Sequence, residues 1–287
     1  MKTLTYITLK TLALIVWLGA ATANAAPLFT EQFAYTTGDT LGSNGWGLTG
    51  AGSVSTLVVA NNLSLSGFAA SSGNAVQLRP NGQDWFRSYT TQAYGNSTAS
   101  LYYSFLLRVD TLGNLDANGG QFGGLTNGNG TAGGAMVGMR VSGAGFQLGV
   151  AKRDFSSLNF DSTVYSTGTT ILIVGAYNLV SGSIQNDTAS LWINPGSLGA
   201  GSAPTATLSA FTTGDNNDFQ TFSSFLWRPQ GNATSTQIPG SLIVDELRVG
   251  NSWADVTPVP EPSTFALVLI SLVGGAFLIR RCRRSIA

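Results

Sequence analysis

The sequence predicts one all-β sandwich over residues 26–258, placed between two apolar terminal segments. Short runs rich in aromatic and β-branched residues alternate with clusters of Gly and Asn, and glycine makes up 36 of the 287 residues. No stretch of this span sustains the 3.6-residue spacing of an amphipathic helix. Nothing within it marks a domain boundary, so we expect one sandwich.

Residues 1–25 are predicted to be a secretory signal peptide. Lys2 and Lys10 flank the start of the chain, an apolar run covers 11–21, and Ala-Asn-Ala occupies 23–25. Small residues at −3 and −1 fit cleavage after Ala25 by signal peptidase. A buried N-terminal helix is the alternative, but the Ala-x-Ala element favours secretion.

Roughly a dozen strands are expected in the sandwich, separated by turns. Gly and Asn supply the positive φ that tight turns need, as at Asn81-Gly82 and in 118–120 and 127–130. The clearest strand-like runs are 75–78, 100–109, 135–141, 145–150, 170–177, 189–193, 219–227 and 241–249.

The C-terminal segment is predicted to cross a membrane. Residues 265–279 are apolar, and Ser263 and Thr264 extend the run to 17 residues, the lower limit for a spanning helix. A cluster of arginines follows and is expected to stay in the cytoplasm. Cys282 lies in this tail, and we interpret it as incidental rather than as a lipidation site. The arginines are Arg280, Arg281, Arg283 and Arg284.

Pro260, Glu261 and Pro262 stand directly before this segment. The order of Pro-Glu-Pro, short apolar helix and arginine cluster over 259–287 resembles the PEP-CTERM sorting signal of Gram-negative bacteria. The resemblance implies an integral-membrane exosortase as partner, with the Pro-Glu-Pro residues as its recognition motif, and an association with exopolysaccharide or matrix. The alternative is an ordinary stop-transfer anchor whose prolines end an extended linker.

The sequence patterns at the start and at the end of the sandwich together resemble a second known family. Residues 29–33 lead through 38–41 to Gly45-Trp46-Gly47, and the strand-like run 242–250 is followed by 253–256. This pairing is similar to the concanavalin A-like, laminin-G-type jelly roll. The resemblance implies that the first and last strands lie together in one sheet. A pair of immunoglobulin-like sandwiches is the main alternative.

Composition excludes several kinds of chemistry. The chain has no histidine and a single cysteine, which removes Ser-His-Asp and Cys-His nucleophiles, His-ligated zinc, intramolecular disulfides and iron–sulfur clusters. Residues 26–259 carry 13 acidic and 8 basic residues, a net charge of −5 without any basic run. Nucleic acid is therefore not an expected partner.

Carboxylate catalysis is not expected either. A retaining glycosidase needs two carboxyl groups about 5–5.5 Å apart, and jelly-roll hydrolases carry them in a Glu-x-Asp-x-x-Glu pattern. Glu31 and Glu246 are the glutamates of the sandwich, and neither begins such a pattern. Asp245 and Glu246 are adjacent, so a regular strand would point them to opposite faces. We therefore expect a protein that is not an enzyme.

Exposed aromatic residues beside polar side chains are the pattern that binds sugars. Trp85, Arg87 and Tyr89 would share one face of a strand. Aromatic residues of a sandwich are more often core, but an arginine on the same face favours a partly exposed surface. These three residues are the candidate glycan-binding site.

Calcium is a further hypothesis. Residues 215–218, Asp-Asn-Asn-Asp, offer oxygen ligands in a turn, with Asp215 and Asp218 as the candidate metal ligands. The alternative is that Asp and Asn serve only as turn formers. No other cofactor is expected.

The sequence therefore predicts an exported bacterial surface or matrix protein. Its C-terminal helix anchors it in the membrane before exosortase processing, and its sandwich contacts polysaccharide without catalysis. A structural surface protein without a specific ligand is the first alternative, and a polysaccharide-active enzyme is the second.

Overall fold

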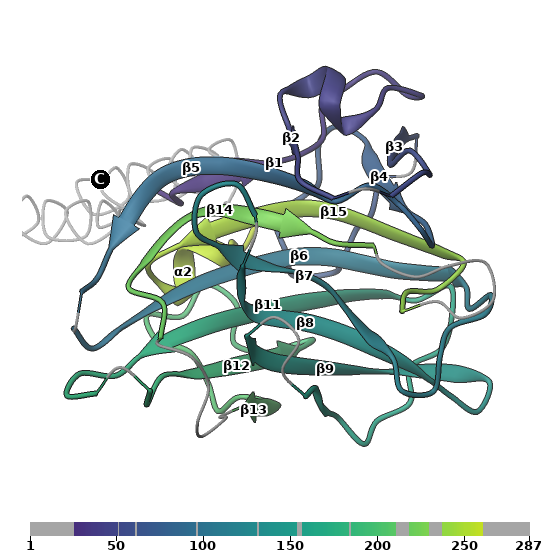
Figure 1. Ribbon diagram of the computed structural model, residues 1–287. Helices are drawn as coiled ribbons and strands as arrows, with labels where there is room; N and C mark the ends of the chain where they lie inside the picture. Colours follow the sequence, from purple (N-terminus) through teal and green to yellow (C-terminus); the bar gives the residue numbers. More distant parts are fainter. Residues whose placement is uncertain are drawn as a thin grey trace, which may run out of the picture.

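The computed structural model describes residues 26–50, 52–60, 62–95, 97–130, 132–153, 157–183, 185–210, 218–229 and 237–260. In these residues, 15 strands form two stacked sheets (Figure 1), and the strand pairs are antiparallel. The predicted all-β sandwich is confirmed. The predicted signal peptide and the predicted membrane helix lie outside the described residues. Among the described residues, no helix has the length and apolar character needed to cross a membrane.

The first sheet is centred on β6 (Ala99–Thr111), its longest strand, which pairs with β11 (Thr170–Leu179) on one side and β15 (Ser241–Gly250) on the other. Strand β1 joins it by pairing with β15. In spatial order the strands are β13 (Leu208–Ala210), β12 (Thr188–Ile193), β11 (Thr170–Leu179), β6 (Ala99–Thr111), β15 (Ser241–Gly250), β4 (Ala75–Leu78) and β3 (Leu57–Val59), with β1 covering Phe29–Glu31.

The second sheet has seven strands and packs against the first. Two short helices complete the fold, η1 (Leu41–Asn44) near the N-terminus and α2 (Trp253–Val256) near the end. In spatial order the strands are β10 (Asn159–Phe160), β9 (Gly145–Arg153), β8 (Gly133–Ser142), β7 (Gly120–Thr126), β14 (Thr221–Trp227), β5 (Trp85–Ala93) and β2 (Gly47–Leu48).

The first and last strands lie side by side, as the jelly-roll resemblance implied. Phe29 pairs with Val249 and Glu31 with Leu247. Strand β15 therefore has β6 along one edge, and along the other edge it has first β4 and then β1. The register shifts between Asp245 and Arg248, where β15 changes partners.

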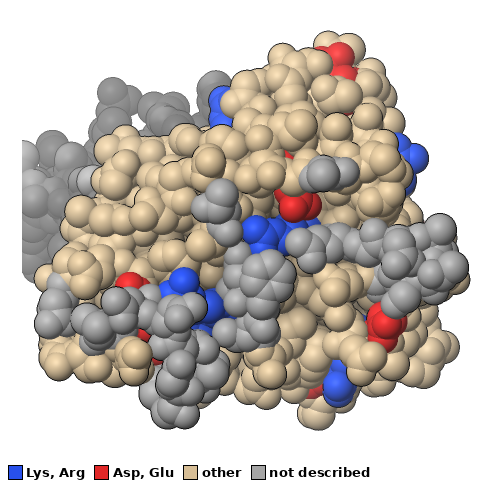
Figure 2. Space-filling model, in the orientation of Figure 1, with Lys and Arg blue, Asp and Glu red and all other residues tan. Residues whose placement is uncertain are grey.

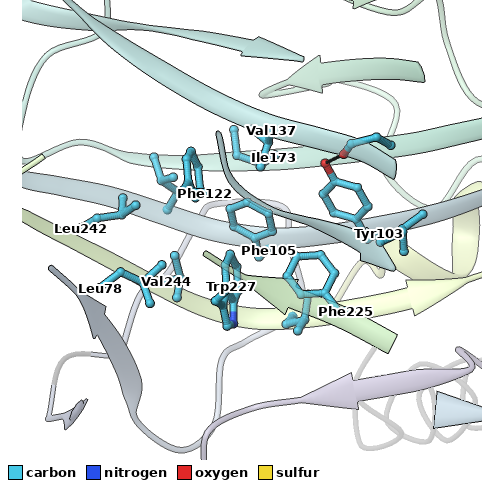
Figure 3. Packing of buried hydrophobic residues seen from close by; sticks show 14 of the residues in the cluster. Leu78, Tyr103, Phe105, Phe122, Val137, Ile173, Phe225, Trp227, Leu242 and Val244 are labelled. Atoms are coloured by element: carbon cyan, nitrogen blue, oxygen red, sulfur yellow. Dashed lines mark hydrogen bonds between the residues drawn. The ribbon is translucent and has the colours of Figure 1, made fainter. Parts of the chain in front are cut away.

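The core between the sheets consists mostly of aliphatic side chains packed around a cluster of aromatic rings, and these residues alternate with outward-facing ones. Phe105 on β6 meets Phe225 and Trp227 of β14, and its ring centroid lies 4.9 Å from that of Trp227 (Figure 3). All three side chains are fully buried. Burial of this much apolar surface is the main stabilising contribution to the sandwich.

A second apolar layer covers the outer face of the first sheet. Trp192 and Trp253 pack with ring centroids 5.1 Å apart. Each indole N–H donates to a backbone carbonyl, that of Trp253 to Ser197 and that of Trp192 to Pro204. A capping box between Ser252 and Asp255 begins α2, so this short helix is held both by its cap and by its tryptophan.

Candidate functional site

The predicted glycan-binding residues share one face of β5, and that face is turned toward the interior. The indole of Trp85 is 6% exposed and belongs to the core between the sheets, and Tyr89 packs against the same core. Arg87 donates from Nη1 to the carbonyl oxygen of Asn44, 2.9 Å away. The arginine is therefore held by the backbone of η1.

Helix η1 covers this face closely. A Cβ at Gly42 would lie 2.6 Å from the indole of Trp85, so only glycine fits there without a shift of the ring. Burial raises the pKa of Tyr89 far above its usual value. The three residues offer a sugar little surface in this arrangement, and glycan binding by them stays a prediction.

A small hollow opens at one end of the sandwich. It is lined by the β5–β6 loop, the β11–β12 loop and the segment before β14. The space in it that a water molecule can occupy is about 10 Å³, roughly the room for one ordered water. The hollow is therefore a shallow depression that accommodates one water or the edge of a larger ligand. The lining residues are Gly95, Ser97, Leu179, Val180, Ser183, Asp187, Asp218, Phe219 and Gln220.

Asp218, a predicted calcium ligand, lines this hollow but is already engaged. Its Oδ1 lies 2.6 Å from Nζ of Lys152, and both side chains are almost fully buried. Its Oδ2 accepts hydrogen bonds from the backbone N–H groups of Asn186 and Asp187, at 2.8 and 3.0 Å. A calcium ion would therefore have to compete with three donors for this carboxylate.

Asp187 is the second carboxylate of the hollow. Its Oδ1 accepts from the N–H of Val180 at 2.7 Å, and the Tyr177 hydroxyl donates to the same carboxyl group. Burial, together with the negative charge of Asp218, raises the pKa of Asp187. Two carboxylates and one ammonium thus meet here, and the hollow favours ligands that donate hydrogen bonds.

Lys152 is the residue of this cluster that sequence reasoning missed. Strand β9 points Phe146, Leu148 and Val150 into the core, and the same alternation continues to Lys152. A lysine in phase with core residues was a signal that a buried acidic partner should exist. Which acid serves as that partner is decided by the β11–β12 loop and the segment before β14.

Arg153 and Phe219 border the same end of the sandwich. The guanidinium carbon of Arg153 lies 4.4 Å from the centroid of the Phe219 ring, and Phe219 lines the hollow. A matching pair, Arg140 over Phe160 at 4.3 Å, lies elsewhere on the second sheet. Arg140 is six residues along β8 from Gly134, the register partner of Arg153, which is about 20 Å of strand.

The contacts around Asp187 and Asp218 in the described residues do not assemble a metal site. The described ranges contain no group of three or more His, Cys, Asp or Glu that could hold a metal ion. Asp215, the other predicted calcium ligand, lies outside the described residues. The calcium hypothesis stays a prediction.

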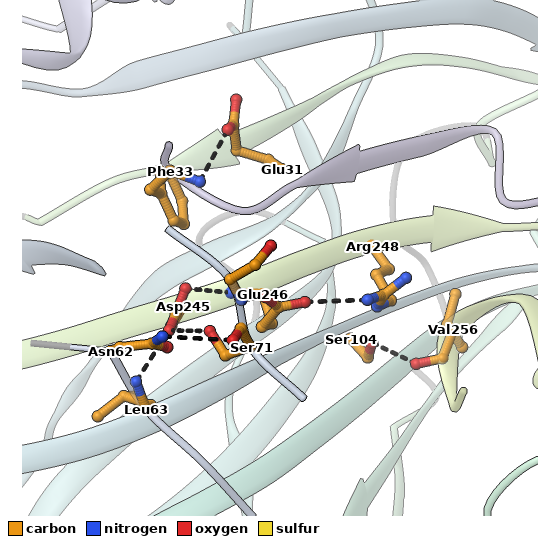
Figure 4. Close-up of polar contacts among 11 residues, drawn as sticks. Glu31, Phe33, Asn62, Leu63, Ser71, Ser104, Asp245, Glu246, Arg248 and Val256 are labelled. Atoms are coloured by element: carbon orange, nitrogen blue, oxygen red, sulfur yellow. Dashed lines mark hydrogen bonds and ion pairs between the residues drawn. The ribbon is translucent and has the colours of Figure 1, made fainter. Parts of the chain in front are cut away.

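Asp245 and Glu246 do not point to opposite faces of β15, which corrects the expectation from strand alternation. Glu246 has a φ of +52° within the irregular part of the strand. Asp245 accepts from the N–H of Leu63 and the hydroxyl of Ser71, both at 2.9 Å, and Glu246 accepts from the N–H of Ser72 at 3.1 Å (Figure 4). The bulge directs both carboxyl groups to one loop.

This acid pair is structural in character. Both side chains are 0% exposed, and Glu246 also binds Arg248 at 2.9 Å. Burial, which outweighs the hydrogen bonds, raises the pKa of Asp245 to about 7. A substrate has no access to either group, so their proximity does not make a glycosidase pair.

The predicted sorting motif begins where the described chain ends. Pro260 is exposed and is the last described residue. Glu261, Pro262 and the four arginines of the tail lie outside the described residues. Thr257 and Pro258 are both bound to the folded body, through their carbonyl oxygens, by Gly199 and Ala69.

Residues 258–284 match the family described as the PEP-CTERM protein-sorting motif. The matched range coincides with the segment expected from the sequence and supports an exosortase substrate. The chain therefore has the features of an exported protein that is sorted through this motif.

No match was found among the curated protein sequences. Among solved structures, the alginate lyase Aly36B is 15% identical, with 79% of this chain and 98% of that chain covered and a TM-score of 0.45. An endo-β-1,4-glucuronan lyase from the fungus Trichoderma reesei is 14% identical (82% and 100% covered, TM-score 0.44). The receptor-binding domain of a botulinum neurotoxin mosaic serotype C/D is 11% identical (79% and 48% covered, TM-score 0.39). At these TM-scores none of the similarities assigns a function.

Proposed function

We propose that this protein is an exosortase-sorted surface or matrix protein whose β-sandwich, a concanavalin A-like jelly roll, associates with polysaccharide without catalysis. The proposed sorting by an exosortase rests on the match to the PEP-CTERM motif at 258–284, which follows the last hydrogen-bonded residues of the sandwich in the sequence. Signal peptidase would release the N-terminus, and the apolar segment 263–279 would hold the chain in the membrane until the exosortase acts.

The state of the reactive side chains favours a non-catalytic role. Burial raises the pKa values of Tyr103 and Tyr177 far above normal, so neither hydroxyl is suited to act as a base at neutral pH. Lys152 is ion-paired with Asp218. The carboxyl groups of Asp245 and Glu246 are sealed under a loop.

Polysaccharide association is supported by the hollow at the end of the sandwich. The carboxylate of Asp187 can accept a hydrogen bond from a sugar hydroxyl, and Phe219 with Arg153 adds an aromatic ring and a planar guanidinium at the same place. Charged groups are sparse on the molecular face seen in Figure 2, as the 10% charged composition implies. We expect recognition to rest on these few groups.

A structural surface protein without a specific ligand is the second candidate. The inward orientation of Trp85, Arg87 and Tyr89 favours it, because the aromatic cluster that suggested sugar stacking is part of the core. The two functions differ in a single measurable property, saturable binding to a glycan.

The test is a binding titration of the mature protein, purified from its host, against the host's exopolysaccharide. Calcium and a chelator are compared in parallel. We expect saturable binding that weakens about tenfold in Arg153→Ala, since a hydrogen bond to a charged group contributes roughly 1.5–3 kcal/mol. Loss of binding under chelation would support calcium at Asp215 and Asp218.

The matched control is Arg140→Ala, which removes an equivalent arginine–phenylalanine stack about 20 Å away. We expect this variant to bind like the parent. If glycan binding weakens equally in both variants, the binding site is not at the hollow. Absence of binding in every condition would support the structural role.

A further inference from the structure

The folded body extends almost to the sorting motif. The carbonyl oxygen of Thr257 accepts from the N–H of Gly199 at 2.8 Å, and that of Pro258 accepts from the N–H of Ala69 at 2.9 Å. Val259 packs against Gly199, where a Cβ would lie 3.1 Å from Cγ1 of the valine. No free linker therefore separates the sandwich from Pro260.

The motif is also close to the apolar segment. Residue 265, where the apolar run begins, follows Pro260 by five residues, and fully extended chain covers at most about 3.6 Å per residue. Pro260, at the surface of the sandwich, is thus within about 18 Å of the residue at which the apolar segment begins. An enzyme that binds Pro-Glu-Pro at this position must meet the folded body.

Two loops form the surface around this exit, which we call the exit face. One loop, 62–74, and the other, 194–206, pack with α2 over the outer side of the first sheet. Neither contains a charged residue, and they belong to charge-free stretches, 40–78 and 188–214. At the overall 10% of charged residues, stretches of this length would be expected to hold several charges.

The charged residues beneath the exit face are either buried or ion-paired. Asp245, Glu246 and Asp255 are buried. Arg248, which lies near the ring of Phe68, is paired with Glu246. The exposed residues of the two loops are small and uncharged: Asn62, Ser64, Ser66, Gly67, Ala70, Ser72, Gly73, Asn194, Gly196, Ser197, Gly201, Ser202 and Thr205.

We propose that the exit face is the surface that the membrane-embedded processing enzyme contacts when it binds the Pro-Glu-Pro motif. This inference rests on the proposed exosortase sorting. The occupant follows from position, because an enzyme that binds Pro-Glu-Pro lies directly beside this face. The lack of charged side chains agrees with this, since charged residues are depleted at the centre of protein–protein interfaces. A lipid surface would instead select exposed Lys, Arg or aromatic side chains, and the exposed loop residues include none of these.

The test introduces charge into the exit face of the full-length chain in its host. In Ser66→Glu/Ser202→Glu we expect processing to slow about tenfold or more, because an unpaired charge at an interface is strongly unfavourable. The measurement is the rate at which newly made protein changes mass. Ser64→Glu/Thr205→Glu is a second pair, used if the first impairs folding. The matched control, Thr90→Glu/Thr91→Glu, adds the same charge at exposed positions of β5 on the other sheet, and should process like the parent.

Two further variants separate the possible outcomes. A flexible ten-residue insertion between Val259 and Pro260 in the slowed variant should restore processing, because the motif can then reach the enzyme without the exit face. Ser66→Lys/Ser202→Lys should also slow processing. Normal processing with lysine and slow processing with glutamate would assign the face to an anionic lipid surface and overturn the proposal.

Parent-like processing of the glutamate variants would overturn the proposal as well. Failure of the proposed sorting itself would look different. In that case the parent chain would not change mass in the host, or would change equally in a host without the exosortase.

Discussion

Two buried carboxylate pairs lie in the described part of this sandwich, and they are stabilised differently. Asp245 and Glu246, on β15, accept hydrogen bonds from one loop, and Arg248 pairs with Glu246. Asp187 and Asp218 line a hollow, and Lys152 supplies a positive charge to the second of them. The first pair fixes a loop to a strand, whereas the second joins β9 to the β11–β12 loop and the segment before β14, around a small depression.

The comparison shows what a buried acid requires. Burial alone raises a carboxyl pKa, and at Asp245 this effect exceeds that of three hydrogen-bond donors. At Asp218 a buried ammonium stands 2.6 Å away, so the charge is balanced within the fold. Removal of the balancing charge should therefore be more costly than removal of a carboxyl group.

The largest effect is expected for Lys152→Met. The change leaves the buried carboxylate of Asp218 without its cation, and such losses cost about 3–5 kcal/mol in free energy of unfolding. Urea unfolding at pH 7 measures it. Lys152→Met/Asp218→Asn should recover most of the loss.

The control for this ion pair is Arg108→Met, which breaks the exposed pair with Asp110. Exposed pairs contribute about 0–1 kcal/mol. A loss at Lys152 no larger than that at Arg108 would mean that the buried pair does not hold the end of the sandwich.

The second effect concerns pH. The pKa of Asp245 is raised to about 7 in the folded protein, so between about pH 4 and 7 the folded state binds more protons than the unfolded state. Stability should therefore fall as pH rises through this window, by at most roughly 4 kcal/mol. Urea unfolding at a series of pH values measures the slope.

Asp245→Asn tests whether this residue is responsible. The variant cannot titrate, and it should flatten the slope while losing some stability at low pH, because an amide accepts fewer hydrogen bonds than a carboxyl group. A slope unchanged from the parent would assign the pH dependence to other groups.

The smallest effect is expected for Asp187→Asn. The pKa of this carboxyl group is raised by burial and by Asp218, so the ionised form opposes folding as pH rises above the unfolded value. The amide should leave the free energy of unfolding at pH 7 unchanged or raise it within about 1 kcal/mol, the scale of one hydrogen bond. A large loss would show that Asp187, like Asp218, is needed as a charge.

The strands could be predicted from local sequence patterns, because alternation and turn residues are properties of neighbouring positions in the chain. The runs 100–109 and 241–249 fall within β6 and β15. The placement of β1 beside β15 followed from a resemblance at the two ends. The bulge at Glu246 was not predictable, since its positive φ is imposed where β15 changes from β4 to β1.

The candidate site was less accessible to sequence reasoning. Alternation correctly placed Trp85, Arg87 and Tyr89 on one face, but the direction of that face depends on η1, whose contacting residues lie 43 positions earlier in the chain. The hollow depends on three loops that are distant in sequence. Asp218 was identified as an acid in a turn, but its partner Lys152 lies 66 residues before it.

By itself, the sequence determined the strand content, the sorting motif and the absence of histidine chemistry, because each of these depends on residue types and their spacing along the chain. The tertiary structure decided which side of each strand is covered, which acid meets which base, and how closely the sorting motif follows the folded body. These depend on contacts between distant segments, and burial then gives the same residue types different charges, accessibilities and roles.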